Sequence, residues 1–189
     1  MSSPTRIGLY GGTFDPIHQG HLHLIEQLFA RDLVDELILV PAGHPWMRDY
    51  APFASAHDRL AMAHLAVNDL PEVVRAHVLV SDVEVNRSGP TYTIDTVEEL
   101  RKFRPDAKWL LILGSDAFAS LPQWHRSAEL HSLIEVLVIA RDGEGLDIEA
   151  LPVSASHIRS QIQNHKSAIK YLPESVWAYI KERNLYVSN

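Results

Sequence analysis

Apolar residues in this chain gather in short, uninterrupted runs, and the segments between them repeat apolar residues every three or four positions. The strongest runs cover residues 7–10, 37–40, 109–113 and 136–139. Runs of this length without apolar-polar alternation are typical of strands buried on both faces of a parallel sheet. With their flanking residues they predict strands over 6–10, 36–40, 109–113 and 135–140, and weaker patterns predict two further strands over 78–85 and 148–153.

The intervening segments carry the apolar spacing of amphipathic helices. They predict helices over 20–31, 55–67, 91–104, 154–163 and 173–184, with a short helix opening at Ser115. Ser55 with Asp58 three residues later favours a capped start, and Pro173 suits a first helical turn. Because strands alternate with helices, the chain is predicted to be an α/β protein with a doubly wound, Rossmann-like parallel sheet. No internal repeat or linker interrupts this order, so residues 1–189 are interpreted as a single domain.

Composition limits the classes of function. The 17 lysines and arginines against 24 aspartates and glutamates give a net charge of −7, which disfavours nonspecific binding to nucleic acid. The absence of cysteine excludes disulfides, thiolate metal sites and cysteine nucleophiles. No apolar run approaches membrane-spanning length and the N-terminus has no signal-like apolar region, so we expect a cytoplasmic protein without a membrane partner.

The most informative stretch is the glycine-rich segment that follows the first predicted strand. Gly11 and Gly12 allow a ligand to approach the backbone closely, because no Cβ intervenes. The helix that begins directly afterwards offers backbone N–H groups and the positive end of its dipole, which suit phosphate. His18 and His21 are three residues apart and share one face of this helix start. A lone histidine is ordinarily a surface residue, but this placement predicts a phosphate site with two imidazoles over it.

Two further predicted strand ends carry polar residues. Taken alone, Gly114 and Asp116 form a turn with a helix-capping carboxylate. Ser156, interpreted as a helix N-cap, presents a hydroxyl and N–H groups to phosphate, and Arg159 one turn later adds a cationic fork. An ordinary capped helix with a surface arginine is the alternative for this pair. Ligands bind beyond the carboxyl ends of strands in such sheets, so these segments are expected to converge at one edge.

The segments Gly12-Thr13-Phe14-Asp15-Pro16 and His18-Gln19-Gly20-His21 resemble the HxGH-type motif of the nucleotidylyltransferase superfamily. Within it, the chain is similar to the bacterial nicotinate-nucleotide adenylyltransferases over nearly its whole length, including residues 154–159 and 171–186. The resemblance implies the Rossmann-like nucleotidylyltransferase fold and transfer of AMP from ATP to nicotinate mononucleotide, which yields deamido-NAD and pyrophosphate. A phosphate oxygen of the acceptor is itself the nucleophile, so direct in-line attack without a covalent enzyme intermediate is implied. Mg²⁺ is the implied cofactor, bridging phosphates with few protein ligands, and no metal-binding residue is assigned.

The resemblance also implies roles for single residues. His18, His21 and Arg159 are implied as catalytic groups that stabilise charge while pyrophosphate leaves. Ser156 and Arg159 are placed by it at the β- and γ-phosphates, and Asp116 at the ribose hydroxyls. ATP binding is implied for a larger set, which comprises Gly11, Gly12, Thr13, Phe14, His18, Gly20, His21, Gly114, Asp116, Ser156 and Arg159.

Acceptor binding is implied for Arg48, Tyr92, Thr93 and Trp124. Trp124 is similar to a tryptophan that stacks on the pyridine ring, with a core tryptophan under a loop as the competing interpretation. Tyr92 and Thr93 resemble the helix start whose backbone N–H meets the nicotinate carboxylate, which favours an acid over a neutral amide. Around Arg48, the sequence Pro45-Trp46-Met47-Arg48 lacks the second proline and the histidine of the family's loop.

Two alternatives to this function stay open at the level of sequence. One is an adenylyltransferase for nicotinamide mononucleotide or another phosphorylated acceptor. The other is a noncatalytic nucleotide-binding module, since a fold does not fix a function. Retention of His18, His21, Ser156 and Arg159 argues against the second. The expected partners are ATP and nicotinate mononucleotide, and the sequence leaves monomer or homo-oligomer undecided.

Overall fold

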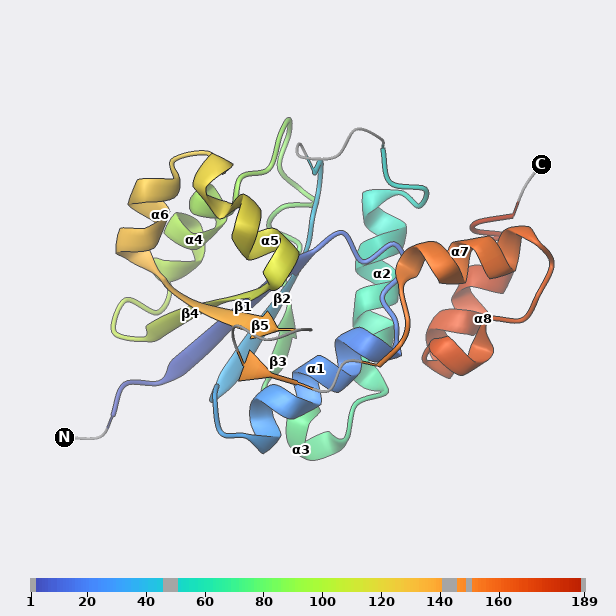
Figure 1. Ribbon diagram of the computed structural model, residues 1–189, viewed down its shortest axis with the longest axis horizontal. Coiled ribbons are helices and arrows are strands. Elements are labelled where there is room, and N and C mark those ends of the chain that lie inside the picture. The colour runs from blue at the N-terminus through green and yellow to red at the C-terminus, as the bar shows by residue number, and fades with distance from the viewer. Residues whose placement is uncertain (1–2, 46–50, 141–145, 149–150, 188–189) are drawn as a thin grey trace.

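The computed structural model describes residues 3–45, 51–140, 146–148 and 151–187 of the 189-residue chain. Six strands in these ranges form one sheet in the order β3-β2-β1-β4-β5-β6, and every neighbouring pair is parallel (Figure 1). The strands are β1 (Arg6–Gly12), β2 (Glu36–Pro41), β3 (Val78–Val80), β4 (Lys108–Gly114), β5 (Glu135–Ala140) and β6 (Leu146–Asp147). The predicted Rossmann-like parallel sheet is therefore confirmed.

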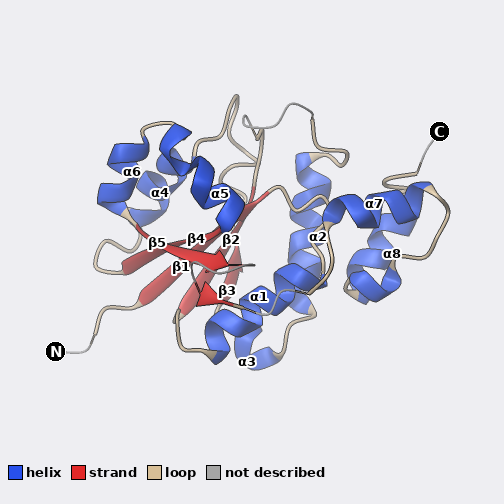
Figure 2. Cartoon of the chain, in the orientation of Figure 1, coloured by secondary structure: helices blue, strands red, loops and turns tan. Residues whose placement is uncertain are grey.

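Helices cover both faces of this sheet, as Figure 2 shows. They are α1 (Gln19–Ala30), α2 (Ala56–Asn68), α3 (Glu72–Arg75), α4 (Thr93–Arg101), α5 (Ser115–Ser120), α6 (Ser127–Leu133), α7 (Ala155–Gln163) and α8 (Glu174–Glu182), with short 3-10 helices at Leu121–Gln123 and Ile169–Tyr171. α4 and α6 pack together on one face, whereas α1 and α2 cover the other and α8 packs on α2. Within the described ranges, none of these helices has the length and apolar character needed to span a membrane.

Each central strand sends alternate apolar side chains into two separate cores. In β2, Leu37 and Leu39 pack on the face covered by α1 and α2, whereas Ile38 and Val40 pack on the face covered by α4 and α6. Both faces of the strand are buried, which is why its apolar run is continuous instead of alternating. This two-sided burial is the physical basis on which the four strongest strands were predictable.

Two predicted strands differ from the structure. β3 ends at Val80 instead of residue 85, because the chain then turns and the Asn86 side-chain amide donates to the Asp82 carboxylate at 2.7 Å. The strand predicted over 148–153 is wrong, since the strand here is β6 and ends at Asp147. Further along, the Val153 N–H donates to the Leu151 carbonyl in a tight turn around a proline, which cannot donate to a sheet.

The strand order reverses at β1, whose neighbours are β2 and β4. All three strands run in the same direction, so their carboxyl ends lie at the same edge of the sheet. In doubly wound sheets a crevice at this position is where ligands bind. The segments after these strands carry the residues singled out in the sequence, and the expected convergence at one edge is confirmed for the segments that follow β1, β2 and β4.

Candidate active site

The site begins at the N-terminus of α1, where the two histidines lie against each other. His18 is the N-cap residue with extended backbone, and its N–H donates to Nδ1 of His21 at 3.1 Å. The two imidazole rings stack with centroids 3.7 Å apart and an interplanar angle of 23°. Because Nδ1 of His21 accepts a hydrogen bond, the proton of a neutral His21 ring resides on Nε2. The backbone of the helix start thereby fixes both the position and the tautomer of His21.

Phe14 and Gly20 shape this histidine pair from two sides. The Phe14 ring is buried and meets the His21 ring edge-on, with centroids 5.0 Å apart. A Cβ on Gly20 would lie 2.9 Å from Val153 Cγ1 and 3.1 Å from the His18 ring, so only glycine fits there. Val153 directly precedes Ser154, the N-cap residue of α7, and this contact brings the start of α7 against the start of α1.

The start of α7 contributes serine hydroxyls and an arginine. Ser154 is the N-cap, and its hydroxyl accepts the His157 N–H at 3.2 Å, so the prediction of Ser156 as N-cap is wrong. Ser156 is the second residue of the helix and is exposed, with its hydroxyl oxygen 3.1 Å from that of Ser154. Arg159 is almost fully buried, which excludes the alternative of an ordinary surface arginine. Its Nη1 donates to the Asp15 carbonyl at 2.6 Å, next to the glycine-rich segment.

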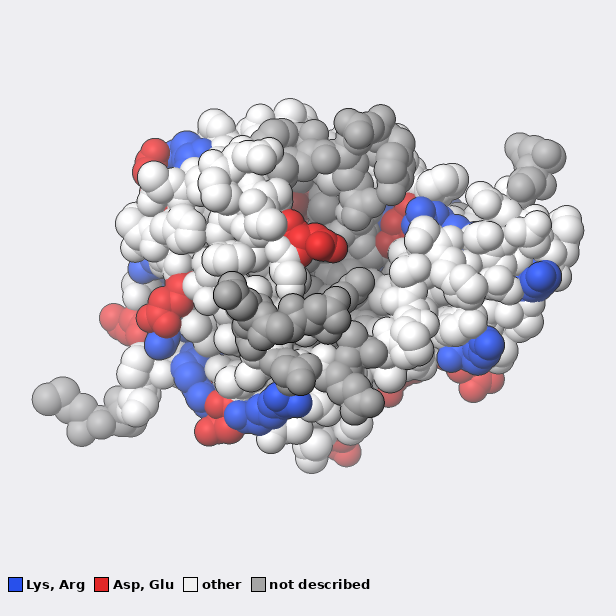
Figure 3. Space-filling view, viewed as in Figure 1, with Lys and Arg blue, Asp and Glu red and all other residues white. Residues whose placement is uncertain are grey.

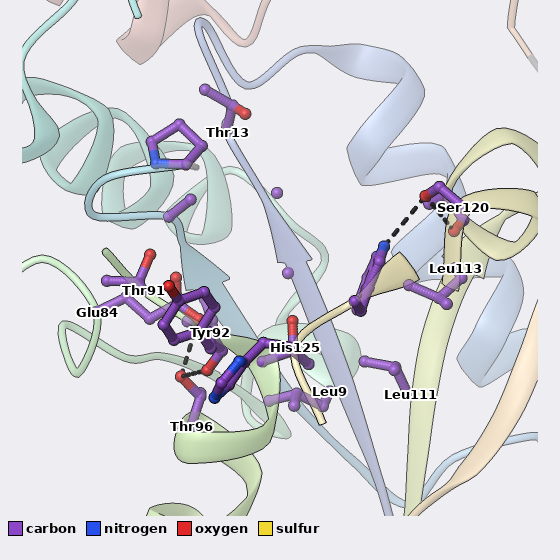
Figure 4. Close-up of a pocket in the computed structure, with 18 of the residues that line it drawn as sticks. Leu9, Thr13, Glu84, Thr91, Tyr92, Thr96, Leu111, Leu113, Ser120 and His125 are labelled. Carbon is purple, nitrogen blue, oxygen red and sulfur yellow. Dashed lines mark hydrogen bonds between the residues drawn. The ribbon is translucent and has the colours of Figure 1, made fainter. Parts of the chain in front are cut away.

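A cavity of about 580 Å³ lies at the carboxyl ends of β1, β2 and β4 (Figure 4). Its wall includes Gly11, Gly12, Thr13 and Asp116 from the predicted ATP-binding set. The same wall includes Tyr92, Thr93 and Trp124 from the predicted acceptor-binding set. The structure therefore brings part of each predicted set into one cavity. His18 and His21 follow the glycine-rich segment and Arg159 contacts it, but all three lie outside this lining, as does Ser156 at the start of α7. Gly114 ends β4 two residues before Asp116, and Arg48 lies outside the described residues.

Aromatic residues gather at the end of the cavity that carries the predicted acceptor-binding residues. The Trp124 indole Nε1 donates to Ser120 Oγ at 3.1 Å, and that hydroxyl donates to the Ala117 carbonyl at 2.8 Å. Trp124 is half-buried at the cavity wall, so it is not a fully enclosed core tryptophan. Tyr92 is the N-cap of α4, and its ring centroid lies 4.3 Å from that of His125. Figure 4 shows the two rings next to each other. The cavity thus combines planar side chains with the N-terminal end of a nine-residue helix.

Sequence reasoning missed Glu84, a buried carboxylate in the same wall. The Thr96 hydroxyl donates to Glu84 Oε1 at 2.9 Å, and burial raises the pKa of the Glu84 carboxyl against the opposing effect of that bond. The Gly43 backbone approaches so closely that a Cβ there would lie 2.0 Å from the Glu84 carbonyl oxygen. No local pattern revealed this residue, because its surroundings come from the loop after β2 and from α4.

A second residue missed by sequence reasoning is Arg59 on α2. It is buried, with 1% of its surface exposed, although an arginine on a helix is ordinarily exposed. Its guanidinium donates to the Thr13 carbonyl at 2.7 Å and to the Gly43 carbonyl at 3.0 Å. Arg59 therefore holds the segments after β1 and β2 in fixed relation to each other. The only sequence signal available was its position one turn into a well-capped helix.

Comparison with known proteins adds the family. The model of the cytidylyltransferase-like family matches residues 9–181. The chain belongs to the cytidylyltransferase-like family. Two relatives, from Dehalococcoides mccartyi and Streptomyces coelicolor and each named "Probable nicotinate-nucleotide adenylyltransferase", are 36% and 34% identical to it. These matches cover 96% and 93% of this chain and 97% and 98% of the relatives, so the resemblance inferred from the motif is confirmed.

Solved structures share the fold of this cytidylyltransferase-like chain. Nicotinic acid mononucleotide adenylyltransferase of Plasmodium falciparum, complexed with NaAD, matches with a TM-score of 0.80 at 22% identity. The match covers 96% of this chain and 97% of that chain. The same protein complexed with APC matches with a TM-score of 0.79. At this level of identity the likeness establishes the fold of the chain.

The charges of this cytidylyltransferase-like chain bear on how a metal ion would be held. In the ranges that the structure describes, no three histidine, aspartate or glutamate side chains gather to hold a metal ion. Figure 3 shows the hollowed face between α5 and α7, with acidic side chains at its rim. Mg²⁺ usually keeps several waters and takes further ligands from substrate phosphates. The donor set fits a cation that arrives bound to a triphosphate and takes few ligands from protein.

Proposed function

We propose that this chain, acting as one domain over residues 1–189, transfers AMP from ATP to nicotinate mononucleotide and releases pyrophosphate. The observation that carries the proposal is the single cavity whose wall joins the glycine-rich segment after β1 to Tyr92, Thr93 and Trp124. A transfer between two nucleotides requires both reacting phosphates at one place, and holding them there lowers the entropic barrier. The names of relatives about 35% identical over nearly the whole chain support the same activity.

ATP binds, in this proposal, across the starts of α1 and α7. Gly11, Gly12 and Thr13 let the triphosphate approach the backbone, and Gly114 with Asp116 faces the ribose hydroxyls. The Nε2–H of His21 points a donor at a phosphate oxygen, because Nδ1 is already an acceptor for the His18 N–H. Ser156 adds an exposed hydroxyl near the departing pyrophosphate.

Phe14, Gly20 and Arg159 support the triphosphate in different ways. Phe14 acts through His21, whose ring it contacts, and Gly20 keeps the space between α1 and the chain before α7. Arg159 supplies a fixed positive charge that stabilises the departing pyrophosphate together with His18 and His21. Each of these groups matters most when negative charge moves onto the leaving oxygen.

Nicotinate mononucleotide occupies the aromatic end of the cavity. Trp124, held by Ser120, is positioned to stack on the pyridine ring. The start of α4 at Tyr92 and Thr93 presents backbone N–H groups and the positive end of the helix dipole to the carboxylate. A neutral amide gains less from such a helix end, so the acid is the preferred acceptor. Arg48 is assigned to the same nucleotide from its place in the motif.

The reaction is a direct in-line displacement at the α-phosphorus of ATP. The 5′-phosphate oxygen of the acceptor forms the new P–O bond while the bond to pyrophosphate breaks, so no side chain becomes covalently attached. A Mg²⁺ ion that arrives with the triphosphate would neutralise part of the phosphate charge. His18, His21 and Arg159 hold donors and positive charge at the leaving group. The protein acts by alignment and by electrostatic stabilisation.

Pyrophosphate release tests the proposal against a noncatalytic nucleotide-binding module. The chain is mixed with MgATP alone, and then with MgATP and nicotinate mononucleotide, while pyrophosphate and deamido-NAD are measured. The proposal is supported if pyrophosphate and deamido-NAD form in equal amounts, and only when nicotinate mononucleotide is present. ATP binding by calorimetry with no pyrophosphate in either mixture would show that the chain is a binding module.

A further inference from the structure

The carboxylate of Asp15 lies buried inside the glycine-rich motif, yet the proposed reaction gives it no direct role. It accepts the Phe53 N–H at 2.8 Å, the Ala54 N–H at 3.1 Å and the Tyr186 hydroxyl at 2.8 Å. Only 5% of Asp15 is exposed. Each bond comes from a part of the chain distant in sequence, and the bond to Tyr186 spans 171 residues. A carboxylate with this many donors is fixed in position and orientation.

Tyr186 reaches this carboxylate from the segment that follows α8. The residue is 7% exposed and has a left-handed backbone with φ of 63°. Burial, followed by the neighbouring Asp15 charge, raises the pKa of the Tyr186 phenol. The hydroxyl therefore keeps its proton over the physiological range and is the donor in the bond to Asp15. The C-terminal segment is thus tied back to the motif that starts α1.

Arg159 is attached to the same residue. Its Nη1 donates to the Asp15 backbone carbonyl at 2.6 Å and lies 4.0 Å from the Asp15 carboxylate Oδ2. Its guanidinium also lies over the Phe53 ring, 4.5 Å from the centroid, and the Phe53 N–H is one of the donors to Asp15. Each of these contacts joins the Arg159 guanidinium either to Asp15 or to Phe53, which is hydrogen-bonded to Asp15. A shift of Asp15 would move the arginine.

We propose that Tyr186 and Asp15 are positioning residues that set the Arg159 guanidinium for the triphosphate of ATP. The inference rests on the proposed function, because that function gives Arg159 its ligand. Loss of the Tyr186 hydroxyl leaves a carboxylate with one donor fewer beside Arg159. The carboxylate then competes with the triphosphate for the guanidinium, and ATP binding weakens while acceptor binding does not change.

A purely structural role for Tyr186 is the alternative, and the chain contains a matched control. The Tyr179 hydroxyl, on α8, donates to Asp58 Oδ1 at 2.9 Å, and Arg183 pairs with the same carboxylate. This is the same kind of tyrosine–aspartate–arginine cluster on the same C-terminal segment. None of its members is bonded to Arg159 in the described structure. Tyr179→Phe therefore removes a comparable bond without touching the proposed positioning path.

The test compares Tyr186→Phe with Tyr179→Phe in the full chain. Thermal unfolding measures stability, calorimetry measures ATP affinity, and steady-state kinetics measure the KM of nicotinate mononucleotide. We expect Tyr186→Phe, which removes a buried bond, to lose at least as much stability as Tyr179→Phe, which removes a half-buried one. ATP affinity is expected to be about tenfold weaker in Tyr186→Phe alone, the scale of one charge-assisted hydrogen bond. The acceptor KM stays unchanged. Equal ATP affinities in the two variants would overturn the proposal.

A double-mutant cycle with Arg159→Ala shows whether Tyr186 acts through the arginine. In that background, Tyr186→Phe is expected to cost no further ATP affinity, whereas a second tenfold loss would contradict the path through Arg159. If Tyr186→Phe does not fold, Asp15→Asn is compared with Asp58→Asn instead. Asp15→Asn removes the charge that holds the Phe53 and Ala54 N–H groups and faces Arg159, so the guanidinium loses its support, and ATP affinity is expected to fall in Asp15→Asn alone. Equal ATP affinities in these two variants would overturn the proposal. Because ATP affinity is measured without turnover, these results stand apart from a failure of the proposed reaction.

Discussion

At the scale of residues, the histidine pair shows what a sequence can and cannot reveal. Two histidines three apart after two glycines were sufficient to predict a phosphate site at a helix start. The sequence could not show that the Nδ1 of His21 accepts the His18 N–H, or that Phe14 contacts the His21 ring. These contacts depend on side-chain directions that are set only when the helix packs against β1.

Removal of His21 tests the role given to this pair. His21→Ala is expected to lower kcat by roughly 10² to 10³, because one group that stabilises the leaving pyrophosphate is lost. The KM of nicotinate mononucleotide is expected to change little, since His21 lies outside the lining of the cavity that carries Tyr92, Thr93 and Trp124. His64→Ala, an exposed histidine on α2, is the control and keeps full activity. An unchanged kcat in His21→Ala would remove the assigned role.

Glu84 makes a second prediction at this scale, concerning pH. Burial raises its pKa above the ordinary 4.5, so the folded protein holds this proton more tightly than the unfolded chain does. The resulting stability is complete below pH 4.5 and is lost as pH rises through the folded-state pKa. Glu84→Gln keeps an acceptor for the Thr96 hydroxyl but does not ionise. Both proteins are compared without substrates. The free energy of unfolding of Glu84→Gln minus that of the native chain should increase between pH 4.5 and neutral pH.

Urea unfolding at a series of pH values measures this difference. Glu182→Gln, at the exposed glutamate that ends α8, provides the control for a glutamate-to-glutamine change outside the core. A difference for Glu84→Gln that stays flat with pH would mean that the Glu84 carboxylate ionises as readily in the folded chain as in the unfolded one.

At the scale of elements, the length of an element decided how well it was predicted. α1, α2 and α8 appear within about three residues of their expected ends, because each presents an apolar stripe to the core over nine or more residues. α3 and α6 were not predicted, since four and seven residues are too few to show a period. The edge strand β6 was misplaced for the same reason, with only two residues in the sheet.

The start of α7 gives a prediction that separates capping from ligand binding. Ser154 is the N-cap, so Ser154→Ala is expected to lower the free energy of unfolding by about 1 kcal/mol. Ser156 is the exposed second residue of α7. Ser156→Ala should therefore change the free energy of unfolding by less than about 0.5 kcal/mol, and should weaken ATP binding instead. Urea unfolding and calorimetry on both variants measure the two effects. The reverse pattern would show that the two serines have exchanged roles.

At the scale of the whole molecule, the strand order places the site. Alternation of strands and helices was enough to predict a doubly wound sheet, and hence a crevice at the carboxyl ends of its strands. The sequence could not predict which distant side chains meet there. Arg59 reaches the carbonyls of Thr13 and Gly43, and Tyr186 reaches Asp15, only because α2 and the C-terminal segment pack beside the motif. Such contacts are set by the complete fold and leave no local pattern.

The central claim is that one cavity joins ATP to a pyridine acid. The most direct measurement is the kcat/KM of the chain with MgATP for nicotinate mononucleotide and for nicotinamide mononucleotide, followed by pyrophosphate release under identical conditions. The helix start at Tyr92 and Thr93 predicts a preference for the acid of at least about tenfold, the scale of one charge-assisted hydrogen bond. Equal values for the two acceptors, or a preference for the amide, would contradict the account.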